Sequence, residues 1–205
     1  MTDLALPLAL ALGAVSGFRH AFEPDHVVAV STLLEGRPRL SRSLRLGASW
    51  GAGHTTTLVF GVLLVTALNV QINESVLGWL EVPVGAMLIG LGLWSVRDAW
   101  TGQLGQAPTI QRTGWGGYAV GLVHGMAGSG ALLLLVAATL PTPAAGIGYA
   151  VLFGLGSVLG MTAVTLALWV PFRAARQRPQ LLRLLTGLAG ALSIGLGLLV
   201  LVEVL

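Results

Sequence analysis

Four histidines and one aspartate carry the chemistry that this sequence can offer. His20, His26, His54 and His124 are all of its histidines, each lies in an apolar stretch, and Asp25 directly precedes His26. An ionisable side chain inside an apolar span is energetically expensive, so a group of them indicates function by default. Imidazole nitrogens with one carboxylate suit Ni²⁺, Co²⁺, Zn²⁺ or Fe²⁺ better than Ca²⁺ or Mg²⁺, which prefer oxygen. The residue types therefore predict a site for a borderline dication.

An interrupted helix is needed to gather these side chains. On a straight helix Asp25 and His26, five and six positions beyond His20, point away from it. Pro24 lacks an N–H group and crowds the carbonyl of His20, so it predicts a bend or an unwound segment. A continuous helix over residues 4–34 would be about 46 Å long, whereas the apolar core of a bilayer is about 30 Å thick. We therefore expect a break that brings His20, Asp25 and His26 together.

The composition identifies the class of protein around this site. Hydrophobic residues make up 55% of the 205 residues and charged residues only 9%, against roughly a quarter charged in a soluble chain. The sequence therefore predicts an all-α integral membrane protein in contact with the lipid bilayer. All eleven basic residues are scattered arginines, which argues against a nucleic-acid partner. The absence of cysteine excludes a thiolate metal site and a disulfide framework.

Six apolar stretches are long enough to cross a membrane. They run approximately over residues 4–34, 44–70, 76–96, 115–139, 145–170 and 181–204. Ten of the eleven arginines fall in or directly beside the first, third and fifth connections, and arginine is retained on the cytoplasmic side. We therefore predict a multi-pass protein of the cytoplasmic (inner) membrane with both termini on the outer side.

The two halves of the sequence resemble each other. Gly85–Leu93 matches Gly190–Leu198 at seven of nine positions with an offset of 105, and two further pairs of short motifs keep offsets of 104 and 107. Three spans in each half make the second copy cross in the opposite sense, as in the inverted repeats of secondary transporters. We predict a first three-helix repeat over residues 1–100, a cytoplasmic linker over 101–114 and a second repeat over 115–205. The first and fourth helices are expected to be discontinuous.

The motifs also carry a resemblance to a known family. Arg19–Val27 looks like the H-x4-D-H signature of the nickel/cobalt transporter family, and Gly53-His54-Thr55 is similar to its Gly-His-Ser-Thr element. The six spans look more like the short, urease-accessory-type relatives than the eight-span members. The resemblance implies that His20, Asp25, His26 and His54 bind transported Ni²⁺ or Co²⁺, with no permanently bound cofactor. It also implies a link to the assembly of urease or another nickel enzyme.

The sequence departs from the family in its second half. The later acidic element is replaced by Ala127–Ala131, and His124 lies just upstream as a further candidate ligand. The hypothesis is a permease, not an enzyme, that carries the ion inward while two three-span halves rock about the site. A small-solute exporter of related architecture, a metal efflux carrier, a haem-binding electron carrier and a serine protease acting through Ser129 are the alternatives.

Each residue also has a purely structural alternative. His20, Asp25 and His26 could form a hydrogen-bonded lock across the kink, with Arg19 paired to Asp25 or Glu23. His54 could be a polar contact between helices, as a single histidine in a membrane often is. His124 has no acidic partner in its own half of the chain, so a role in packing is equally open to it.

Overall fold

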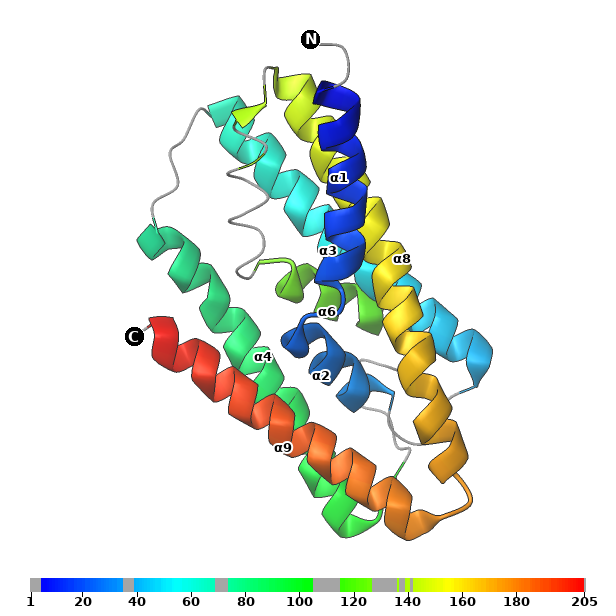
Figure 1. Cartoon of the computed structure of the whole chain (residues 1–205). Coiled ribbons are helices and arrows are strands. Elements are labelled where there is room, and N and C mark those ends of the chain that lie inside the picture. The colour runs from blue at the N-terminus through cyan, green and yellow to red at the C-terminus, as the bar shows by residue number, and fades with distance from the viewer. Residues whose placement is uncertain are drawn as a thin grey trace.

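The described part of the chain is helical. The computed structural model describes residues 5–34, 39–68, 74–104, 115–126 and 142–204, together with 136, 139 and 140. Its helices are α1 (Ala5–His20), α2 (Pro24–Leu33), α3 (Leu40–Leu68), α4 (Glu74–Thr101), α6 (Gly116–His124), α8 (Pro143–Ala175) and α9 (Pro179–Val204), shown in Figure 1. The predicted all-α architecture is confirmed for these residues.

Four of the helices are long and apolar enough to cross a bilayer. They cover Leu40–Leu68, Gly78–Thr101, Pro143–Ala175 and Pro179–Val204, and they correspond to the second, third, fifth and sixth predicted spans. The first predicted span is divided between α1 and α2. The fourth begins with α6, and residues 127–135 lie outside the described ranges. Six crossings therefore stay a prediction.

The expected break in the first span is present, slightly before the proline. The Phe22 amide donates to the Arg19 carbonyl at 3.0 Å, and the Glu23 amide donates to the His20 carbonyl at 3.0 Å, which closes α1 with a tight turn. Pro24 is then the first residue of α2, a position where its missing N–H leaves no hydrogen bond unmade. Pro24 has no N–H group to donate to the His20 carbonyl, so the Glu23 amide donates to it instead.

The long helices pack in pairs around two short ones. α4 lies against α9, α3 against α8, α1 against α8 and α6 against α3. The short helices α2 and α6 lie in the middle of the bundle (Figure 1), and α2 contacts α4, α8 and α9. The main apolar core includes Val30, Trp50, Leu88, Met161 and Leu182, so residues from both halves of the chain bury α2.

Glycines bring the backbones of α3 and α6 into direct contact. A Cβ atom added to Gly53 would overlap the carbonyl oxygen of Tyr118, and one added to Gly121 would overlap that of Trp50. Small residues at such positions allow helices to approach closely in membranes. The close approach places the end of α6 beside the middle of α3.

An equivalent pair of glycine contacts joins α1 to α8. Gly17, 104 residues before Gly121, faces the Phe153 carbonyl, and Gly156, 103 residues after Gly53, faces the Ala14 carbonyl. The contact between α1 and α8 therefore repeats the contact between α6 and α3 at equivalent positions of the two halves.

The packing of α4 on α9 is reciprocal. A Cβ on Gly92 would lie 2.6 Å from the Gly190 carbonyl oxygen, and a Cβ on Gly197 would lie 2.6 Å from the Gly85 carbonyl oxygen. These glycines belong to the two matching sequence segments. Each segment therefore contacts the other in an antiparallel, nearly two-fold arrangement.

We predict that Gly53→Ala destabilises the fold, whereas Gly61→Ala in the same helix does not. The added methyl at position 53 meets backbone of α6, and overpacking of this kind costs about 1–3 kcal/mol. Nothing lies within 4 Å of a Cβ at Gly61, and alanine there favours the helix by up to about 1 kcal/mol. Thermal unfolding of the detergent-solubilised variants measures the difference. Equal unfolding midpoints would contradict the close α3–α6 contact.

Candidate metal centre

Four different helices each contribute one buried histidine to the same place. His20 is the last residue of α1, His26 lies in the first turn of α2, and His124 is the last residue of α6. His54 lies at the centre of α3, with fourteen residues before it and fourteen after it. Their exposed fractions are 5% or less. The ends of three helices and the midpoint of a fourth thus meet at the site.

His26 occupies the middle of the group. Its ring centroid lies 4.3 Å from that of His20, 5.2 Å from that of His54 and 4.1 Å from that of His124. The break between α1 and α2 makes the first of these distances possible, because residues six positions apart point in different directions on one helix. The predicted convergence of His20 and His26 is confirmed.

Asp25 joins the two halves of the chain. One carboxylate oxygen accepts a hydrogen bond from the His26 backbone amide at 2.9 Å and lies 2.9 Å from the Nδ1 atom of the same residue. The other carboxylate oxygen lies 3.0 Å from Nε2 of His124. The first turn of α2 also favours a negative charge, because backbone N–H groups are exposed there. His124 therefore has an acidic partner, supplied by the first half of the chain.

Several ring nitrogens of the site lack a hydrogen-bond partner among the residues that the structure describes. They are Nε2 of His26, both ring nitrogens of His54 and Nδ1 of His124. Leaving a buried polar group unpaired costs about 1–3 kcal/mol, and native proteins rarely tolerate several such groups together. Lone pairs that point at no hydrogen are the groups that a metal ion would use.

The geometry offers two groups of three ligand atoms. His20, His26 and His54 form one group, and Asp25, His26 and His124 form the other. Within each group the ligand atoms lie within 4.8 Å of one another. Two nitrogens bound to opposite sides of one ion are about 4 Å apart, so small side-chain shifts suffice to coordinate an ion. All five residues expected from the sequence are thus brought together.

Two neighbours of the site were not expected from the sequence. An oxygen of Glu23, whose side chain is 52% exposed, lies 2.9 Å from Nδ1 of His20. Trp50 is fully buried beside His26 and His124, with ring centroids 5.5 and 5.6 Å away. The spacing of three positions between His20 and Glu23, and of four between Trp50 and His54, is the signal that could have identified them.

The contacts of the described residues bear on the structural alternatives. Asp25 and His26 are hydrogen-bonded, as in the proposed lock across the kink. The carboxylate of Asp25 is engaged by His26 and His124, not by Arg19, among the ion pairs that the described residues make. His54 makes no interhelical hydrogen bond within the described part of the chain. The interpretation of His54 as a polar contact between helices requires such a bond. The protease alternative depends on Ser129, which lies outside the described residues.

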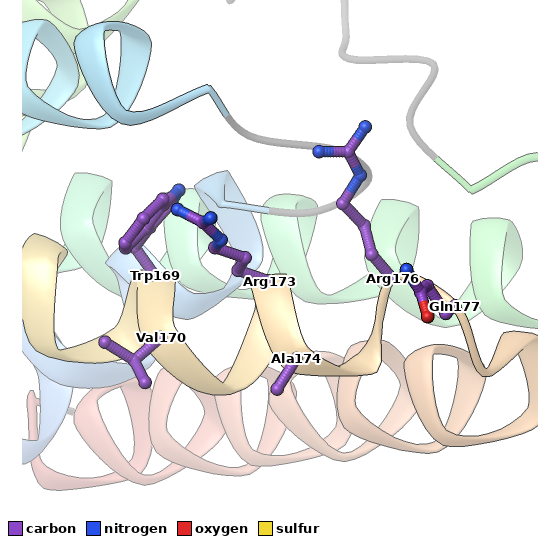
Figure 2. A pocket seen from close by; sticks show the side chains of 6 residues that line it. All are labelled: Trp169, Val170, Arg173, Ala174, Arg176 and Gln177. Carbon is purple, nitrogen blue, oxygen red and sulfur yellow. The ribbon is translucent and has the colours of Figure 1, made fainter.

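A second hollow lies at the carboxyl end of α8, away from the histidines. Figure 2 shows its lining residues, which are Trp169, Val170, Arg173, Ala174, Arg176 and Gln177. The guanidinium of Arg173 lies 4.7 Å from the centre of the Trp169 ring. Both charged residues that line this hollow are arginines, which repel a dication. It is therefore not a candidate for the metal.

Comparison with known proteins identifies the family. The chain is 32% identical over 190 residues to the urease accessory protein UreH of Bacillus sp. (strain TB-90), and the match covers 87% of the chain and 83% of that relative. The chain belongs to the UreH family. No family model and no solved structure matches this UreH-family chain.

Two plant proteins are also similar to this UreH-family member. The match to the Arabidopsis thaliana chloroplast protein FOR GROWTH AND FERTILITY 2 is 28% identical over 206 residues, and that to FOR GROWTH AND FERTILITY 1 is 26% identical over 210 residues. The chain spans 55% and 56% of their respective lengths. Kinship with a urease accessory protein agrees with the expectation that this membrane protein is not an enzyme.

We predict that His54→Leu leaves the metal-free protein as stable as before or more stable by about 1 kcal/mol, since it removes two unpaired buried nitrogens. Asp25→Leu should destabilise it by about 1–3 kcal/mol, because His26 and His124 lose their shared acceptor. Thermal unfolding in detergent with a chelator present measures both effects. Equal destabilisation by the two variants would mean that His54 has a bonded partner.

Proposed function

We propose that this UreH-family protein is a secondary transporter that moves Ni²⁺ or Co²⁺ inward across the cytoplasmic membrane. The observation that carries the proposal is the cluster of four buried histidines. Within it, both ring nitrogens of His54, Nε2 of His26 and Nδ1 of His124 lack a hydrogen-bond partner among the described residues. His54 lies about 21 Å from either end of α3 at about 1.5 Å per residue, which corresponds to mid-bilayer depth. Polar residues at that depth mark ion pathways.

The ligand chemistry favours a borderline dication that is released again. Neutral imidazoles and the single carboxylate of Asp25 compensate only part of a double charge, so the ion is held less firmly than in a permanent site. Nitrogen-rich sets suit nickel and cobalt better than magnesium or calcium. Urease is a nickel enzyme, so similarity to a urease accessory protein favours nickel, supplied for urease or another nickel enzyme.

The transport cycle in this proposal uses two inverted three-helix repeats. The repeated glycine contacts of α1 on α8 and of α6 on α3, together with the reciprocal contact of α4 and α9, support this symmetry. Equivalent positions then place His20 of the first repeat opposite His124 of the second. Alternating access in such proteins is largely a rocking of one repeat against the other around a central site.

The membrane potential supplies enough energy for accumulation. Two charges that move through 100 mV gain about 4.6 kcal/mol, which corresponds to more than three decades of concentration. An inward carrier of a dication therefore needs no additional coupling ion, provided that the cell interior is negative.

We predict that proteoliposomes containing the protein take up Ni²⁺ or Co²⁺ when a potassium diffusion potential makes their interior negative. Asp25→Asn should slow uptake about 10-fold or more, as expected when a coordinating group or its hydrogen-bonded support is lost. The matched control is Glu203→Gln, which removes an exposed carboxylate near the end of α9 and should transport normally.

Three results would contradict this function. Uptake by Asp25→Asn at the wild-type rate would separate transport from the site. Metal movement only outward, under either sign of potential, would favour an efflux carrier. A His20→Ala variant that moves metal normally but loses export of a small solute would favour the solute exporter.

The proposed orientation has its own test. Because the chain contains no cysteine, single cysteines introduced at exposed helix ends report the side of the membrane. A membrane-impermeant maleimide should label Ala144→Cys in intact cells, and should label Ser41→Cys and Thr101→Cys only after permeabilisation. The reverse pattern would place the termini in the cytoplasm.

A further inference from the structure

We propose that the site holds the ion at two adjoining positions that share His26. The first position is formed by His20, His26 and His54, and the second by Asp25, His26 and His124. This inference rests on the proposed function and adds a pathway to it. The ion moves between the positions by exchanging His20 and His54 for Asp25 and His124 on either side of His26.

The distances separate the two positions. His26 lies 4.1 Å from His124 and 5.2 Å from His54, whereas the rings of His54 and His124 are 6.2 Å apart. His54 and His124 do not share a group of ligand atoms within 4.8 Å. The ligand atoms therefore give a different neighbour set for each position, with His26 common to both.

The two positions differ in whether an ion must break hydrogen bonds in order to bind. In the first, Nε2 of His26 and both nitrogens of His54 lack partners among the described residues, so coordination there breaks no hydrogen bond of these atoms. Asp25 holds Nδ1 of His26 at 2.9 Å from behind, as the carboxylate does in many carboxylate–histidine–metal arrangements. We assign loading of the ion to this position.

The second position is already internally bonded. Both oxygens of Asp25 are engaged, one by His26 and one by His124. An ion at this position exchanges these hydrogen bonds for coordination bonds. The proton of each imidazole moves to the other nitrogen of its own ring, so no net proton is released. When the ion leaves, the hydrogen bonds form again. Release is therefore favoured from this position.

The helices approach the two positions from opposite ends of the bundle. Gly13 and Gly17 of α1 face Tyr149 and Phe153 near the start of α8, whereas Gly117 of α6 faces Leu46 and Ser49 near the start of α3. Since α3 and α8 run antiparallel, with Gly47 against Thr162 and Gly154 against Thr55, α1 and α6 enter from opposite sides. His20 is thus the last residue of the helix that enters from the outer side, and His124 is the last residue of the helix that enters from the inner side.

Cobalt binding and transport by two variants test this pathway. His124→Gln keeps an N–H donor for Asp25 but removes the imidazole, so it should bind Co²⁺ within about 3-fold of wild-type affinity and transport it at least about 10-fold more slowly. His54→Ala should weaken Co²⁺ binding at least about 10-fold. Affinities come from titration of the purified protein in detergent, and the ligand set from X-ray absorption at the cobalt edge. Circular dichroism and gel filtration confirm that each variant is folded.

The outcomes distinguish this inference from the proposed function. Equal loss of Co²⁺ affinity in His124→Gln and His54→Ala, with one unchanged set of remaining ligands, would mean a single shared position and overturn the pathway alone. Wild-type transport by folded His124→Gln would also overturn it. Failure of the wild-type protein to bind and move Co²⁺ or Ni²⁺ would overturn the proposed function itself.

Discussion

The need to satisfy polar groups buried among apolar helices governs this structure. Water is scarce at the centre of a membrane bundle, so each imidazole and carboxylate there needs a protein partner or an ion. Asp25 serves His26 and His124, while His54 is left without a partner in the described part of the chain. The fold keeps this imbalance because glycine-mediated contacts fix the surrounding backbones. In the proposed carrier, a bound dication removes this imbalance.

The short helix α2 connects the candidate metal centre to the rest of the bundle. It begins at Pro24, beside the histidines, and ends at Leu33 in the core shared with Leu182 of α9. Because α2 contacts α4, α8 and α9, a change at Asp25 or His26 reaches the reciprocally packed pair α4–α9 through one rigid element. The break before Pro24 separates this element from α1.

Much of the site could be predicted from sequence because its signals are local and rare. A proline between His20 and His26 in an apolar span predicts a break that brings the two histidines together. The structure contains the break and places the two rings side by side. The position of the break was less predictable, because proline is accommodated best as the first residue of α2. The pairing of Asp25 with His124 could not be foreseen, since it depends on the packing of helices 99 residues apart in sequence. Likewise, the contacts of Trp50 with His26 and His124 depend on how three separate helices pack together.

The central place of His54 in α3 also has an electrical consequence. An ion held halfway through the apolar layer has crossed about half of the voltage, so its electrical distance from either surface is about one half. A dication then gains about 2.3 kcal/mol per 100 mV in reaching the site and the same amount in leaving it. In the proposed carrier, the field therefore assists arrival and departure of the ion equally. If the ligands lay close to one surface, the field would instead assist either entry or exit of the ion much more than the other step.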